Sequence, residues 1–124
     1  MRIIQVTDAF AVSSQVIATD MVDIREQGFT TVINNRPDSE SGHSTASLRA
    51  AAEVSGLQYI DIPVFGSHFP AETIAKMQVA LATHDKVLAF CRTGNRSINA
   101  WARAQSHVTN VAALVKEAGF SLFE

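Results

Sequence analysis

The chain has one cysteine, Cys91, and the residues that follow it could support nucleophilic chemistry. A short apolar run precedes the cysteine, and Arg92, Gly94 and Arg96 follow within five positions. Positive charge and the start of a helix favour the thiolate, which is the form that attacks. Gly94 lets successive amides turn toward one point, and Arg96 can bind an oxyanion bidentately. We therefore predict that Cys91 is a nucleophile and that Arg96 is its oxyanion-binding partner.

Other residues near this loop are candidates for binding the same anion. We rank Arg96 above Arg92, because the residue next to the cysteine often points to solvent. A free cysteine is often a small buried hydrophobe, but core filling gives no reason for the residues that crowd the next five positions. Ser97 could cap the following helix or donate a hydrogen bond to the sulfur. The candidate anion ligands are Arg92, Thr93, Gly94, Asn95, Ser97 and, at the end of an earlier strand, Arg36 with Asn35.

Composition limits the classes of protein to consider. With 124 residues, of which 47% are hydrophobic, the chain can bury one core, and we expect a single domain over residues 1–124. The net charge of −2 and the scattered basic residues argue against nucleic acid as a partner. Asp8 interrupts the opening segment and no apolar run approaches ~20 residues, so we expect a cytoplasmic protein without a membrane segment.

The single cysteine also limits redox and metal chemistry. One cysteine cannot close an internal disulfide, and no ligand spacing typical of zinc accompanies it. We therefore expect neither a metal site nor a cofactor. The oligomeric state is not indicated by the sequence.

Short β-branched runs alternate with helical periodicity along the chain, which is typical of a parallel sheet with crossover helices. Two opening runs, 2–6 and 10–12, look like a hairpin or an edge pair. Gly28, Gly56 and Gly119 are placed to end helices. The predicted fold is a single α/β domain with a mostly parallel four- or five-stranded sheet flanked by helices. Further strands are expected at 29–34, 57–62 and 87–90, and helices at 19–27, 44–55, 70–83, 97–106 and 108–118, with long loops at 34–47 and 63–70.

The order of these features resembles a known family. The matching stretches are Phe-Ala-Val-Ser-Ser-Gln at 10–15, Gly-Phe-Thr-Thr-Val-Ile-Asn-Asn-Arg-Pro-Asp at 28–38, Gly-Leu-Gln-Tyr-Ile-Asp-Ile-Pro-Val at 56–64, Val-Leu-Ala-Phe-Cys-Arg-Thr-Gly-Asn-Arg-Ser at 87–97 and Ala-Gly-Phe at 118–120. Together they resemble the phosphatase-like domain family found alone or fused to metallo-beta-lactamase-type hydrolases, a branch of the dual-specificity protein tyrosine phosphatase superfamily. The resemblance implies a protein tyrosine phosphatase-like fold and a small anionic or phosphorylated substrate. It also implies that Cys91 attacks phosphorus while Arg96 and the loop amides bind the phosphoryl oxygens.

The chain departs from the superfamily pattern in three places. Four residues separate Cys91 from Arg96, whereas the superfamily loop has five, and Phe90 replaces the usual histidine. The aspartate that protonates the leaving oxygen is expected where the chain has Gly66. Other acids could take this role, and the candidates are Asp38, Glu40, Asp61 and His68.

Two further functions stay open on these residues. The shorter loop also resembles that of rhodaneses, in which Cys91 would carry a persulfide and no general acid is needed. However, the Gly-His-Ile-Pro-Gly-Ala stretch of rhodaneses is missing. A noncatalytic module that binds an anion or a partner is the other alternative. We expect Trp101 and Phe120 to pack in the core or between helices, and the remaining histidines to lie at the surface, at positions 43, 84 and 107.

Overall fold

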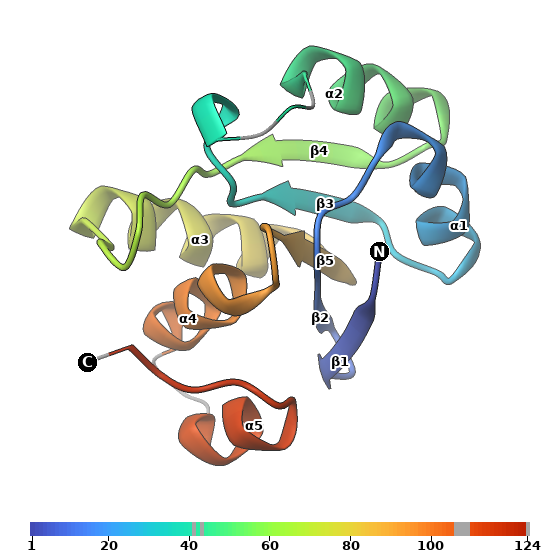
Figure 1. Cartoon of the computed structure of the whole chain (residues 1–124). Helices are drawn as coiled ribbons and strands as arrows, with labels where there is room; N and C mark the ends of the chain where they lie inside the picture. Colours follow the sequence, from blue (N-terminus) through green and yellow to red (C-terminus); the bar gives the residue numbers. More distant parts are fainter. Residues whose placement is uncertain (41, 43, 106–109, 124) are drawn as a thin grey trace.

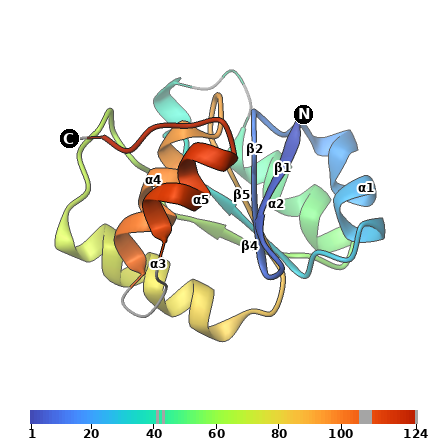
Figure 2. The same cartoon turned by 90° about the horizontal axis from the view of Figure 1, so that it is seen from below.

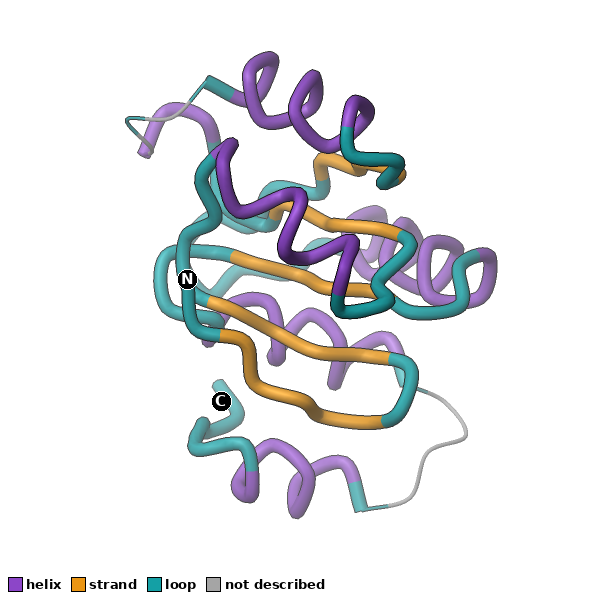
Figure 3. Tube along the Cα trace, turned by 90° about the vertical axis from the view of Figure 1, so that its right-hand side faces the viewer, coloured by secondary structure: helices purple, strands orange, loops and turns teal. Residues whose placement is uncertain are grey.

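The protein folds around one five-stranded sheet, as seen in a computed structural model that describes residues 1–40, 42, 44–105 and 110–123. The strands are β1 (Ile3–Thr7), β2 (Phe10–Ser13), β3 (Thr31–Asn34), β4 (Gln58–Asp61) and β5 (Val87–Phe90), in the order β1-β2-β5-β3-β4. Figure 3 shows them side by side as one layer. The predicted α/β fold is confirmed.

The pairing of the strands places β5 at the centre of the sheet. β1 and β2 form an antiparallel hairpin at one edge, with an irregularity between Gln5 and Thr7. β2, β5, β3 and β4 are all parallel, and Asn34 of β3 lies opposite Phe90 of β5. Every residue of β3 and β5 is buried, which explains the wholly apolar run of β5 and the three β-branched residues that begin β3. The hairpin at the start of the chain is confirmed.

Helices cover both faces of the sheet (Figure 1). One face carries α1 (Met21–Glu26) and α2 (Thr45–Val54), and the other carries α3 (Ala71–Thr83), α4 (Asn95–Ala104) and α5 (Val111–Glu117). Figure 2 views the molecule from the side of these three helices. Short 3₁₀ turns precede α1, at Ala18–Asp20, and α2, at Asp38–Glu40.

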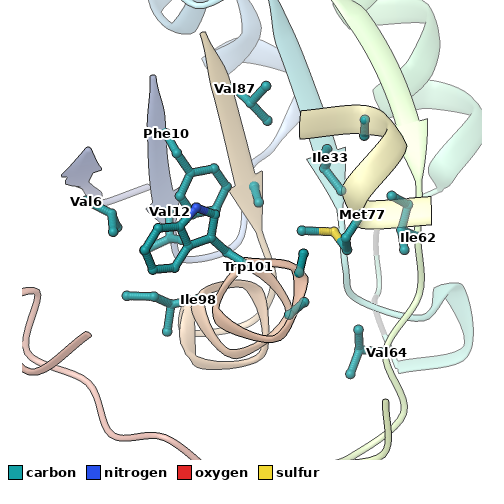
Figure 4. Close-up of a cluster of buried hydrophobic side chains, with 14 of the residues drawn as sticks. Val6, Phe10, Val12, Ile33, Ile62, Val64, Met77, Val87, Ile98 and Trp101 are labelled. Carbon is teal, nitrogen blue, oxygen red and sulfur yellow. The ribbon is translucent and has the colours of Figure 1, made fainter. Parts of the chain in front are cut away.

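Each face of the sheet has its own apolar core. Beneath α3 and α4, the ring of Trp101 stacks on Phe10 with centroids 5.5 Å apart, and Met77 fills the space toward β3 (Figure 4). Beneath α1 and α2, the core contains Phe29 and Phe90, both fully buried. Trp101 is therefore a core residue, as predicted. Because the two cores hold the sheet from both sides, the carboxyl ends of the parallel strands are rigidly placed.

Several predicted boundaries are wrong. The first helix starts at Met21 because Ala18–Asp20 form a 3₁₀ turn, and the helix after the cysteine starts at Asn95 rather than at Ser97. The last helix ends at Glu117. His84 was expected at the surface, but it is half-buried at the end of α3. His43, His107 and the predicted helix ends at Ser106 and Val108 lie outside the described residues.

Candidate active site

Cys91 lies directly after β5, at the carboxyl end of the central strand. Its backbone N–H donates to the carbonyl of Ser13 at 3.4 Å, and the residue is buried, with 1% of its surface exposed. The chain then turns back over the sulfur, so that the N–H of Gly94 points at the Cys91 Sγ at 3.1 Å. An amide donor at this distance stabilises negative charge on sulfur. One backbone amide of the loop therefore contacts the buried sulfur.

Gly94 connects this loop to α4. It is the N-terminal cap of the helix, and its φ of 99° is a left-handed conformation that glycine adopts without strain. The N–H of Asn95 is bonded to the Thr93 hydroxyl at 3.3 Å, and Asn95 is the first helical residue. Arg96 is consequently part of the first helical turn, where the free amides and the helix dipole also favour anions.

Ser97 does not cap the helix. The cap is Gly94, and the Ser97 Oγ is buried without a hydrogen-bond partner among the described residues. A buried hydroxyl is normally satisfied, so an unpaired one next to the loop is unusual. The capping prediction for Ser97 is therefore wrong, and its hydroxyl forms no hydrogen bond to the Cys91 sulfur in this structure.

The guanidinium of Arg96 is held by two partners. Its Nη1 donates to the Val64 carbonyl at 3.0 Å and to the Glu40 Oε2 at 3.0 Å, and its Nη2 is 3.0 Å from the Glu40 Oε1. The guanidinium and the carboxylate therefore face each other with one hydrogen bond and one further close ion-pair contact. Only 12% of the Arg96 side chain is exposed, against 38% for Glu40. The arginine is therefore fixed, while the carboxylate borders solvent.

Arg36 lies on the other side of the same carboxylate. Its Nη2 donates to the Glu40 backbone carbonyl at 2.9 Å, and its Nη1 donates to the Gln15 Oε1 at 3.0 Å. The Arg36 Nε is 3.9 Å from the Glu40 Oε1 and has no hydrogen-bond partner among the described residues. Gln15 also bonds to the cysteine loop, through its N–H and the Arg92 carbonyl at 3.3 Å. The structure thus brings Arg36 and Arg96 together around Glu40.

Arg92 and Thr93 occupy the outer part of the loop. Both side chains are exposed, and both border a cavity of about 380 Å³ next to Arg2 and Phe120. The residues that line this cavity do not include Arg96. Among the described residues, the Arg92 side chain forms no hydrogen bond or ion pair with Glu40 or Cys91, and its rank below Arg96 stays a prediction.

The three other acid candidates have different partners. Asp61 is bonded to Arg49 at 2.8 Å, and Asp38 accepts the N–H of Thr45 at 3.4 Å, at the start of α2. His68 is exposed in a turn, where its N–H donates to the Phe65 carbonyl. Within the described part of the chain none of the three forms a hydrogen bond or an ion pair with Cys91 or Arg96.

Buried amides hold the strand ends beneath the loop. The Asn34 side chain donates to the Tyr59 hydroxyl at 3.0 Å, and the Asn35 side chain donates to the Ile62 carbonyl at 2.9 Å. Burial, with a smaller contribution from Asp61, raises the pKa of Tyr59 above its usual value of 10.0. Asn35 was expected near the substrate, but its buried amide braces the backbone. Neither this role nor the contacts of Gln15 and Val64 could be predicted from local spacing, because their partners, Arg36 and Arg96, lie far away in the sequence.

No helix in the described part of the chain is long and apolar enough to cross a membrane. No group of three or more histidine, cysteine, aspartate or glutamate side chains there is arranged to hold a metal ion.

The sheet, the flanking helices and the loop after the central strand define an α/β domain with the fold of protein tyrosine phosphatase-like phosphatases. The chain belongs to the family described as beta-lactamase hydrolase-like protein, phosphatase-like domain, whose model matches residues 2–108. The predicted resemblance is confirmed.

Individual relatives agree with this assignment. The beta-lactamase hydrolase-like protein of Xylella fastidiosa (strain 9a5c) is 31% identical over 108 residues, which are 85% of this chain and 25% of that protein. The chain therefore spans about a quarter of the length of this curated relative. A candidate phosphatase from Neisseria meningitidis Z2491 is 25% identical with a TM-score of 0.82, covering 98% of this chain and 91% of that one. TpbA of P. aeruginosa, solved in complex with pTyr, has a TM-score of 0.61 at 14% identity, covering 81% and 59%.

Proposed function

We propose that this domain hydrolyses phosphate monoesters and that Cys91 is the nucleophile. The observation that carries the proposal is the N–H of Gly94 directed at the Cys91 Sγ at 3.1 Å, in a loop between the central strand and α4. A loop that donates an amide to a sulfur stabilises the thiolate, and a thiolate at a helix N-terminus attacks electrophiles. The phosphatase-like family and the similarity to phosphatase structures support phosphorus as the electrophile.

The reaction would proceed in two displacements. The Cys91 thiolate attacks phosphorus, a sulfur–phosphorus bond forms as the phosphorus–oxygen ester bond breaks, and the leaving oxygen takes up a proton from the solvent. Water then attacks the phosphocysteine, which releases inorganic phosphate and restores the thiolate. The loop amides and the Arg96 guanidinium would bind the phosphoryl oxygens, on which charge is concentrated in both steps. Ser97, with its buried and unpaired hydroxyl, would donate to the sulfur when it leaves phosphorus in the second step.

The choice of test substrate follows from the leaving group. None of Asp38, Asp61 and His68 forms a hydrogen bond or ion pair with Cys91 or Arg96 within the described residues, so a substrate that needs little protonation of its leaving oxygen is preferred. Aryl phosphates meet this condition because a phenolate is a weak base. The phosphotyrosine bound to TpbA is an ester of the same kind.

Hydrolysis of an aryl phosphate by the wild-type chain and by Cys91→Ser tests the proposal. We expect the wild type to release phosphate and the variant to lose this activity completely, because a hydroxyl is not ionised at neutral pH. Thiosulfate-to-cyanide sulfur transfer is measured in parallel. Transfer without hydrolysis would replace the proposal by a sulfurtransferase, and the absence of both activities would favour a noncatalytic anion- or partner-binding module.

A further inference from the structure

The Glu40 carboxylate is bound to the Arg96 guanidinium, which the proposed reaction needs for binding the phosphoryl group. Both terminal nitrogens of the guanidinium are 3.0 Å from an oxygen of the Glu40 carboxylate. Two oxygens of a phosphoryl group have nearly the same spacing and charge as two carboxylate oxygens, and they bind arginine in the same way. We propose that Glu40 is an internal competitor of the substrate, which must be displaced from Arg96 and which thereby selects dianionic over monoanionic ligands. This inference rests on the proposed function, because it concerns ligands of the same loop.

The exchange requires only a side-chain rotation. The Glu40 side chain is 38% exposed, so its carboxylate can turn into water, where it is well solvated. The backbone of Glu40 stays in place, because its carbonyl accepts a bond from the Arg36 Nη2 at 2.9 Å. Arg96 also keeps its position, because its Nη1 is bonded to the Val64 carbonyl at 3.0 Å. The binding site would therefore persist after the carboxylate has left.

The charges around Glu40 favour a dianion as its replacement. Arg36 and Arg96 supply two positive charges, and Glu40 supplies one negative charge between them. A phosphate monoester carries nearly two negative charges at neutral pH and would neutralise both arginines. It also has a third oxygen, which can bind the loop amides and the unpaired Arg36 Nε.

A monoanion gains little from the same exchange. It would replace one carboxylate charge by another, and the tethered Glu40 has a high effective concentration that a dissolved anion must overcome. Acetate, formate and phosphodiesters would therefore be excluded, although the guanidinium itself could accept them. This is how Glu40 would determine specificity without touching the substrate.

Anion binding to unreacted protein tests the inference without any turnover. The titrants are orthophosphate, sulfate and acetate, measured by calorimetry on the wild type, Glu40→Gln and Glu40→Ala. Glu53→Gln is the matched control, because Glu53 is an exposed carboxylate on α2 and the change in net charge is the same. Thermal unfolding without titrant verifies that each variant is folded.

We expect both Glu40 variants to bind phosphate and sulfate about tenfold more tightly than the wild type, which is the equivalent of about 1.4 kcal/mol. Acetate should bind the Glu40 variants but not the wild type, and Glu53→Gln should behave as the wild type. Unchanged or weaker phosphate binding in both Glu40 variants would overturn the inference and make Glu40 a residue that orients Arg96.

The outcomes separate this inference from the proposed hydrolysis. Tighter binding in the Glu40 variants together with no hydrolysis would support the competitor role and reject the phosphatase. Hydrolysis by the wild type together with no gain in anion affinity would reject the competitor role alone. An absence of anion binding to every protein would overturn both.

Discussion

Gly94 is the residue at which the sulfur, the loop backbone and the C-terminal segment meet, and its substitution by alanine gives a sharp prediction. A Cβ at this position would lie 3.0 Å from the Phe120 Cζ and 3.5 Å from the Ser13 carbonyl oxygen. The backbone φ is +99°, which an L-residue with a side chain rarely adopts. Gly94→Ala therefore introduces both backbone strain and a side-chain clash.

The size of the effect follows from these two contributions. The left-handed conformation costs an alanine about 1–2 kcal/mol. Displacing a packed aromatic ring adds about 1 kcal/mol or more. Gly119→Ala isolates the first contribution, because Gly119 has a φ of +91° and nothing within 4 Å of its added Cβ. We expect Gly119→Ala to lower the free energy of unfolding by about 1–2 kcal/mol, and Gly94→Ala by about 2–4 kcal/mol.

Urea and thermal unfolding of both variants measure this difference. At roughly 4 °C per kcal/mol for a domain of this size, the melting temperature should fall by roughly 10 °C in Gly94→Ala and by about half as much in Gly119→Ala. Repeating Gly94→Ala in a Phe120→Ala background completes a double-mutant cycle, in which the extra cost should disappear. Equal costs for the two glycines, or an unchanged cost without the Phe120 ring, would refute the reasoning.

Three other predictions concern the site. Arg96→Ala should abolish aryl phosphate hydrolysis and phosphate binding, whereas Arg92→Ala should reduce both only slightly, because the Arg92 side chain is exposed. Equal, small losses in both variants would contradict the role of Arg96 in binding the phosphoryl oxygens. Asp61→Asn should leave the pH profile of hydrolysis unchanged, since Asp61 is bonded to Arg49, and a lost limb of that profile would show that it is the acid. Tyr59 is the only tyrosine, so phenolate absorbance should show no ionisation at its usual pKa of 10.0 in the folded chain. Because its folded pKa is raised, its stabilising contribution is complete below about pH 10 and is lost at higher pH; ionisation at the usual value would disprove its burial.

The sheet and the position of the cysteine could be predicted because they depend on local patterns. The run Val87–Phe90 is wholly apolar, which a central parallel strand requires, and Cys91 follows it directly. The hairpin of β1 and β2 needs only a short turn between two β-branched runs. Such signals lie within about ten residues of each other, and chain topology does not change them.

The environment of Arg96 could not be predicted in the same way. Glu40 is 56 positions earlier in the chain, and Val64 is 32 positions earlier. They meet Arg96 only because β3 pairs with β5, and because β4 lies beyond β3, so that the segments after these strands share one edge of the sheet. Glu40 was considered as an acid, but its partner depends on strand order, which the sequence pattern does not specify.

The short spacing between Cys91 and Arg96 has a different meaning once α4 is seen to begin at Asn95. From the sequence alone, the loop between Cys91 and Arg96 is one residue shorter than the superfamily loop. In the structure Arg96 belongs to the first turn of a helix that is packed on the sheet through Trp101. The Val64 carbonyl, which is not part of the loop, fixes the guanidinium. The position of the guanidinium is therefore set by α4 and the segment after β4. A loop that is one residue shorter than in the superfamily does not by itself prevent Arg96 from facing an anion bound over the sulfur.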